Sequence, residues 1–172
     1  PRSTLFPYTT LFRSGADLLL ATDPDCDRCG IAVRTSDGYR LLTGNEVGLL
    51  LLDFICSQRC SHHRMPDNPV FVKTVVTMDL AEKIAAHYGV RTINVLTGFK
   101  YIGETIGKLE KEGRENDYIC GFEESYGYLT GTYVRDKDAV NAALMICEMF
   151  AWYKTRDVSL SEKLSWLFEE YG

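Results

Sequence analysis

From residue 70 onward, short apolar runs alternate with amphipathic segments. The apolar runs are residues 70–76, 91–96 and 117–122. The segments between them, residues 79–88 and 101–112, place apolar residues at helical spacing and are followed by Gly89 and Gly113, as is typical of helix ends. Strands that are separated by helices of this length predict right-handed βαβ crossovers and a parallel sheet.

The first part of the chain has a pattern in which strands predominate. Residues 16–23, ADLLLATD, are an apolar run that ends in a polar loop, which predicts a buried strand whose carboxyl end carries function. Residues 29–44 predict a β-hairpin around the turn residues 36–38. Residues 46–58 are apolar on nearly every side and predict a buried helix, with Asn45 as its N-cap.

These elements predict an α/β fold class: a three-layer α/β/α domain with a mostly parallel sheet, preceded by the C-terminal part of a second similar domain. A polar loop over residues 123–137 leads to a long helix at 138–156. We expect the earlier part to cover residues 15–40 and the α/β/α domain to cover residues 41–168. Residues 1–14 contain TLFPYTTLFRS, which reads like a translated sequencing adaptor, and we interpret them as an artefact.

Composition and charge exclude several classes of function. The chain has 172 residues and a net charge of -5, and no basic cluster is interleaved with aromatic residues, so we expect no nucleic-acid partner. No apolar run approaches the roughly 20 residues that a membrane span needs, so we expect no membrane partner and a cytoplasmic location. The pair Cys26 and Cys29 straddles a loop and a strand start, unlike a redox motif, and CSQRCSHH at residues 56–63 matches no zinc module closely.

An acidic loop, TDPDCDR, carries the clearest candidate chemistry. Asp23, Asp25 and Asp27 alternate along it and Arg28 follows at once. Two carboxylates about 5 Å apart at an effective dielectric of about 20 repel each other by roughly 3 kcal/mol, so a cation is expected among them. An EF-hand would need Gly and Glu where Arg28 and Arg34 stand, which excludes that motif. A solvated acidic turn and a Mg²⁺ site remain, and we favour Mg²⁺ because alternate positions on an extended segment point to one side.

Four segments together resemble one family. They are DPDCDR, LLTGNE, VLTGFKYIG and GFEESYGYL…VRDKD, in residues 15 to about 168. In their order and spacing they resemble the signatures of the α-D-phosphohexomutases, the phosphoglucomutase and phosphomannomutase superfamily, and look closest to its bacterial phosphoglucomutase-like branch. The resemblance implies that residues 15–40 end the second domain of a four-domain enzyme and that residues 41–168 form its third, sugar-binding domain.

The resemblance also implies an activity, that of an intramolecular phosphotransferase of the isomerase class. Glucose 1-phosphate and glucose 6-phosphate would interconvert through a phosphoserine and a glucose 1,6-bisphosphate intermediate. Asp23, Asp25 and Asp27 would hold one Mg²⁺ ion, and Arg28 would steady the phosphoserine region. By the same motifs, substrate contacts would come from Lys100, Glu123 and Ser125, and Lys137 would belong to the proton-transfer region.

Several alternatives stay open. The family's phosphoserine loop and its fourth-domain phosphate-binding loop are absent from this sequence, so the chain lacks both the donor and the phosphate clamp, and domains 1 and 4 would be its missing partners. A phosphomannomutase or phosphopentomutase of the same family is an alternative, as is a non-catalytic module that binds metal or sugar phosphate. A phosphatase of the haloacid dehalogenase type is disfavoured, because Asp27 stands where that class carries Thr or Val.

Overall fold

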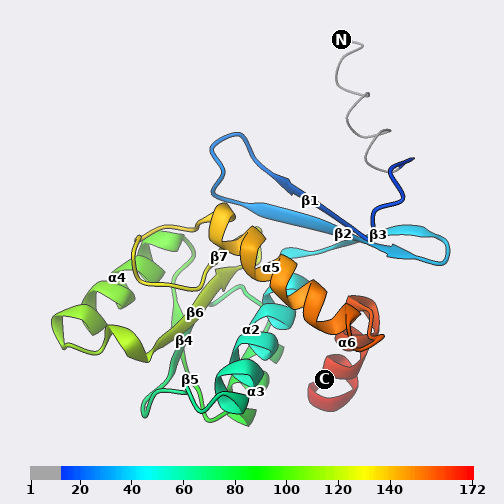
Figure 1. Ribbon diagram of the computed structural model, residues 1–172. Helices are drawn as coiled ribbons and strands as arrows, with labels where there is room; N and C mark the ends of the chain where they lie inside the picture. Colours follow the sequence, from blue (N-terminus) through cyan, green and yellow to red (C-terminus); the bar gives the residue numbers. More distant parts are fainter. Residues whose placement is uncertain (1–12) are drawn as a thin grey trace.

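The structure is a computed structural model that describes residues 13–172 (Figure 1). The interpretation of residues 1–14 as an artefact falls mainly on residues 1–12, which lie outside the described residues. The strands are β1 (Leu18–Thr22), β2 (Cys29–Thr35), β3 (Gly38–Leu42), β4 (Val70–Thr74), β5 (Arg91–Val95), β6 (Tyr118–Glu123) and β7 (Gly127–Leu129). The helices are α2 (Gly44–Ser61), α3 (Leu80–His87), α4 (Phe99–Lys111), α5 (Ala139–Lys154), α6 (Leu160–Tyr171) and the short 3-10 helix η1 (Glu115–Asp117).

The first three strands form an antiparallel sheet in the order β1-β2-β3. The predicted hairpin is confirmed: Thr35 pairs with Gly38 across a tight turn, where glycine adopts φ 128°. The prediction that β1 is a buried strand is wrong, because its residues are half-buried or exposed. Among the described residues β1 pairs only with β2, so it is an edge strand with one open side.

The remaining strands form a sheet in the order β5-β4-β6-β7. Strand β4 pairs in parallel with β5 and with β6, and β7 runs antiparallel to β6. The predicted α/β fold with a mostly parallel sheet is confirmed. The prediction of an uninterrupted loop over residues 123–137 is wrong, because Gly127–Leu129 is buried as a strand. Its central residue, Tyr128, packs against Phe122 and donates a hydrogen bond from its hydroxyl to the carbonyl of Gly44.

Helices cover both faces of this sheet (Figure 1). On one face Phe71, Ile119 and Phe122 join the core that α2, α3, α5 and α6 complete, and on the other face Val70 and Val72 pack against α4. Successive residues of β4 therefore supply opposite cores, as the two-residue period of a strand requires. None of the helices in the described part of the chain is long and apolar enough to cross a membrane.

The start of α2 corrects one prediction and adds an inter-element contact. Thr43, not Asn45, caps the helix: its Oγ1 accepts from the backbone N–H of Glu46 at 3.2 Å, and Glu46 accepts from the N–H of Thr43 at 2.7 Å. This reciprocal pair is a capping box. The Oδ1 atom of Asn45 instead accepts from the backbone N–H of Met78 at 3.1 Å, which ties α2 to the loop between β4 and α3.

Candidate functional site

The acidic loop, residues 23–28, is organised by its first carboxylate. Asp23 Oδ1 accepts from the backbone N–H groups of Asp27 and Arg28 at 3.1 and 3.0 Å, and Oδ2 pairs with Arg28 Nε at 2.8 Å. The backbone hydrogen bond from Arg28, followed by its side chain, holds the pKa of Asp23 well below its usual range. Cys26 turns the loop with φ 58°. The loop is thus built around a carboxylate that stays ionised.

The three predicted metal ligands converge. Asp23, Asp25 and Asp27 each offer one oxygen, and these oxygens lie within 4.8 Å of one another. Asp27 Oδ1 is buried and accepts no hydrogen bond from any residue in the range 13–172, although Arg28 Nε is 3.5 Å away. A buried carboxylate oxygen without a hydrogen-bond partner is costly unless another group satisfies it. The donor set, carboxylate oxygens alone, is the one that hard divalent cations prefer, so these residues fit Mg²⁺.

Lys137 is a predicted site residue that lies far from the acidic loop in the sequence, and its side chain reaches that loop. Its Nζ lies 2.7 Å from Asp27 Oδ2 and 3.3 Å from Asp136 Oδ1. Burial lowers the pKa of the Lys137 ammonium, but the hydrogen bonds and charges of Asp27 and Asp136 outweigh burial and raise it above its usual value. Lys137 is therefore a positively charged group at neutral pH beside Asp27, and it leaves Asp27 Oδ1 available.

Glu123 and Ser125 lie at the end of β6 and in the turn before β7. Glu123 is only 6% exposed, its Oε1 accepts from the backbone N–H of Gly98 at 3.1 Å, and the hydroxyl of Ser125 lies 3.5 Å from its Oε2. Burial raises the pKa of Glu123, although the Gly98 N–H and the charge of Lys137 oppose the shift. This carboxylate keeps acceptor capacity on Oε2, where the described part of the chain makes only the weak Ser125 contact.

The turn between β6 and β7 joins this carboxylate to the acidic loop. Arg28 forms an antiparallel bridge with Gly127, and the N–H of Cys29 donates to the carbonyl of Tyr126 at 3.1 Å. A Cβ on Gly127 would lie 2.7 Å from Lys137 Cδ and 3.5 Å from Glu123 Oε2. Glycine therefore suits the close approach of Lys137 to this turn, and the acidic loop, the lysine and the carboxylate form one site.

Lys100 is the predicted site residue that the structure places away from the other predicted site residues. It lies exposed in the first turn of α4, with Nζ 4.8 Å from the ring centroid of Tyr101. The segment that carries it does belong to the site, because Gly98 of the same TGFK motif donates to Glu123. The loop is held in place by its backbone, while the Lys100 side chain points to solvent.

Sequence reasoning missed the residues that brace the Glu123 turn. Glu124 Oε2 accepts from the hydroxyls of Thr74 and Thr77 at 3.3 and 3.4 Å, and a Cβ on Gly44 would lie 2.1 Å from the carbonyl oxygen of Glu124. Two threonines at the carboxyl end of an apolar strand were the available signal. These contacts hold the turn against the loop after β4 and the start of α2.

Comparisons with known proteins place this chain in a family. A family model described as phosphoglucomutase/phosphomannomutase, alpha/beta/alpha domain III, matches residues 43–171. The chain belongs to the phosphoglucomutase/phosphomannomutase family. The phosphoglucomutase of Staphylococcus aureus strain N315 is 36% identical over 162 residues, which are 93% of this chain and 28% of that protein, and the one from strain USA300 matches to the same extent. The chain thus spans 28% of the length of these relatives.

Two solved structures of the family share the fold. The structure of pp63/parafusin (phosphoglucomutase) from Paramecium, in its open form, has a TM-score of 0.69 at 19% identity. The match covers 94% of this chain and 26% of the Paramecium chain. A phosphoglucomutase/phosphomannomutase family protein from Burkholderia thailandensis has a TM-score of 0.67 at 17% identity, and the match covers 97% of this chain and 32% of that protein's chain. Identity this low supports the fold alone, so the site geometry above stands on this chain's own residues.

Proposed function

We propose that this chain is part of a phosphoglucomutase that interconverts glucose 1-phosphate and glucose 6-phosphate. The observation that carries the proposal is the convergence of three carboxylates beside Lys137 and Glu123, which the chain brings together from three separate segments. The relatives at 36% identity are named phosphoglucomutases, which supports the same activity. We expect the protein to act in the cytoplasm.

In this proposal Asp23, Asp25 and Asp27 hold one Mg²⁺ ion, and Asp27 Oδ1 is the oxygen whose missing partner the ion replaces. A cation held by these three residues would supply positive charge to offset the negative charge on the oxygens of a transferring phosphoryl group. Arg28 keeps its guanidinium at the rim of the loop through its pairs with Asp23 and Asp27, where it can steady an incoming phosphoserine.

The remaining residues act on the sugar. A phosphoryl transfer from phosphoserine to a sugar hydroxyl breaks the serine O–P bond, forms the sugar O–P bond and releases the hydroxyl proton. Lys137 is protonated at the start, so it stabilises the anionic oxygens, gives its proton to the serine oxygen that leaves and takes up the proton that the sugar hydroxyl loses. Glu123 Oε2 and Ser125 can bind vicinal sugar hydroxyls, and Lys100 can reach an anionic substrate from the solvent side.

The serine donor and the phosphate-binding loop would come from the rest of a longer protein, as domains 1 and 4. The assignment of residues 15–40 to domain 2 and of residues 41–168 to domain 3 is part of the proposal. On this account the 172-residue chain alone, given glucose 1-phosphate, Mg²⁺ and glucose 1,6-bisphosphate, forms no glucose 6-phosphate, because its nucleophile is missing. Turnover above background would place a donor within these residues and overturn the assignment.

The direct test uses the longer enzyme that contains this chain. Asp25→Asn should lower kcat/KM for glucose 1-phosphate by about a hundredfold or more, because an amide is a poor ligand for a hard cation. Asp37→Asn removes an exposed carboxylate from the β2–β3 turn and is the matched control, which should keep normal kinetics. Normal turnover in Asp25→Asn would show that the acidic loop does not hold a catalytic ion.

The sugar contacts have a separate kinetic test. Glu123→Gln should cost about 1.5 to 3 kcal/mol of transition-state stabilisation, or about ten- to over a hundredfold in kcat/KM, in both directions of the reaction. Ser125→Ala should cost less, because its hydroxyl makes a neutral contact. Unchanged efficiency in both variants would remove this turn from the site. A wild-type preference for mannose 1-phosphate would overturn only the choice of glucose.

A further inference from the structure

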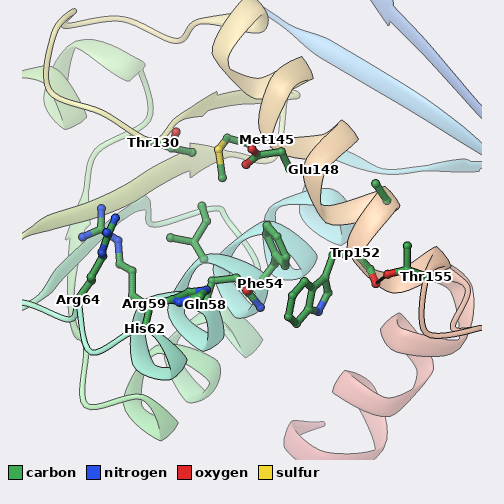
Figure 2. Close-up of a pocket in the computed structure, with 12 residues that line it drawn as sticks. Phe54, Gln58, Arg59, His62, Arg64, Thr130, Met145, Glu148, Trp152 and Thr155 are labelled. Carbon is green, nitrogen blue, oxygen red and sulfur yellow. Dashed lines mark hydrogen bonds between the residues drawn. The ribbon is translucent and has the colours of Figure 1, made fainter.

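A cavity of about 820 Å³ lies between the end of α2 and the second half of α5 (Figure 2). None of the residues that line it belongs to the site proposed above. Its volume is in the range of small-molecule sites, which run from about 300 to 1,000 Å³. Its lining has a cationic wall at one end and an aromatic wall toward the other end (Figure 2).

The cationic wall consists of Arg59, from the last turn of α2, and Arg64, from the segment that follows, with His62 between them in the sequence. The N–H of Arg64 donates to the carbonyl of Arg59 at 2.8 Å, so the backbone holds the two arginines in a fixed relation. Both also line an adjoining cleft of about 590 Å³. Within residues 13–172 neither guanidinium forms an ion pair, whereas most other arginines in this range do.

A purely structural role for Arg59 would be to compensate the negative end of the α2 dipole. In that role its guanidinium would donate to the last carbonyls of the helix, and no such bond forms in the described residues. The chain has a net charge of -5, so two unpaired guanidinium groups that share a cavity are a local exception. Paired guanidinium groups are suited to bidentate binding of phosphate oxygens.

The aromatic wall consists of Phe54 and Trp152, whose ring centroids are 6.4 Å apart. The guanidinium of Arg156 lies 3.2 Å from the Trp152 ring centroid and covers one face of the indole. Figure 2 shows both rings at the cavity, away from the arginines, with Met145 and Glu148 above them in this view. Glu148 is exposed and has no ion-pair partner in residues 13–172, so it repels a bare anion but can accept from hydroxyl groups of a ligand.

We propose that this cavity binds a nucleotide. Arg59 and Arg64 hold the phosphate, the planar base packs against Trp152 and Phe54, and Glu148 accepts from the ribose hydroxyls. Inorganic phosphate would use only the cationic wall and meet the charge of Glu148, so it should bind much more weakly. The proposal adds a ligand site to the chain and does not depend on the phosphoglucomutase activity.

The fluorescence of Trp152 can report the binding of a ligand at this site. The chain has two tryptophans, and Trp166→Phe leaves Trp152 as the only one. In this background, ADP in a buffer with EDTA should quench Trp152 fluorescence to saturation below about 1 mM, a free energy of about 4 kcal/mol or more. EDTA excludes any contribution from a metal ion at the acidic loop. The absence of saturable quenching, checked by calorimetry, would overturn the proposal.

Variants then separate the two walls. Arg59→Gln with Arg64→Gln should weaken ADP binding by about tenfold or more, because charge-assisted bonds are lost. Arg91→Gln, an exposed arginine on β5, is the matched control and should bind ADP normally. Glu148→Gln should strengthen binding of inorganic phosphate, since only repulsion is removed. Equal ADP affinity in the double variant and the control would refute the cationic wall, and phosphate as tight as ADP would refute the base contact.

One comparison keeps this inference distinct from the proposed mutase. Asp25→Asn should leave ADP quenching of Trp152 unchanged. Loss of quenching in this variant would mean that ADP reaches the acidic loop and not this cavity, which would overturn the proposal. Circular dichroism of each variant shows whether the fold is retained.

Discussion

Two groups of carboxylates in this chain have opposite surroundings. Asp53 of α2 is 2% exposed, and its oxygens receive the hydroxyls of Tyr88 at 2.9 Å and Tyr153 at 3.3 Å and the ammonium of Lys163 at 2.8 Å. The acidic loop has three carboxylates, and within it Asp27 keeps a buried oxygen to which no described residue donates a hydrogen bond. Asp53 is buried and satisfied, and the acidic loop is more open and under-satisfied.

The difference teaches how to separate a structural carboxylate from a functional one. A buried charge persists when neighbours from other elements supply all of its hydrogen bonds, and Asp53 joins α2 to α3, α5 and α6 in this way. Charges that repel each other with one oxygen unpaired lower stability unless a ligand binds. Mutations should therefore have opposite effects at the two groups.

The largest expected effect on stability is at Asp53. Asp53→Asn should lower the free energy of unfolding by about 2 to 4 kcal/mol, because it leaves Lys163 beside a neutral amide. Urea unfolding measures this loss, with Asp37→Asn as the surface control. The double variant with Lys163→Met should recover part of it. A loss no larger than that of the control would mean that the Asp53 cluster contributes little to stability.

The N-cap of α2 should have an effect of intermediate size on stability, and it has no role in binding. Thr43→Ala should cost about 1 kcal/mol, because the N–H of Glu46 loses its acceptor. Asn45→Ala should not reproduce a capping loss, since its Oδ1 binds the N–H of Met78. Thermal unfolding followed by far-UV circular dichroism measures the stability of both variants. An equal loss of stability in Thr43→Ala and Asn45→Ala would contradict the capping assignment.

The smallest expected effect is a gain in stability, from a change at Glu123. Its pKa is raised in the folded state, so the stability that its protonated form contributes is present below the unfolded pKa of about 4.3 and is lost as pH rises through the folded pKa. Glu123→Gln should therefore be more stable than the parent chain at pH 7 and equal to it below about pH 4. Urea titrations at both pH values measure this difference. A pH-independent difference would contradict the burial argument.

Periodicity predicted the parts of the fold that repeat a local rule. The strands and helices after residue 70 followed from alternating periods and from glycine at helix ends, such as Gly89 and Gly113. Strand β7 was missed because Gly127–Leu129 is short and lies in a polar segment, and only its pairing with β6 makes it a strand. The Asn45 error was avoidable, since Thr43 and Glu46 have capping-box spacing. Helix α6 was missed, although Ser159 and Glu162 have the same spacing.

The site could be predicted as a set of residues but not as an arrangement. Alternation along an extended segment was enough to group Asp23, Asp25 and Asp27. The contact of Lys137 with Asp27 depends on how two distant loops meet, and no local pattern contains that information. The metal assignment and the residue roles stay predictions.

Titration of the 172-residue chain with Mg²⁺ by calorimetry tests the central claim, that the acidic loop is under-satisfied because it holds a cation. The account predicts saturable binding of one ion. Asp25→Asn should weaken that binding by about tenfold or more without loss of stability in the metal-free state, while Asp37→Asn binds normally. Equal Mg²⁺ affinity in Asp25→Asn and Asp37→Asn, or no saturable binding by the parent chain, would contradict the account.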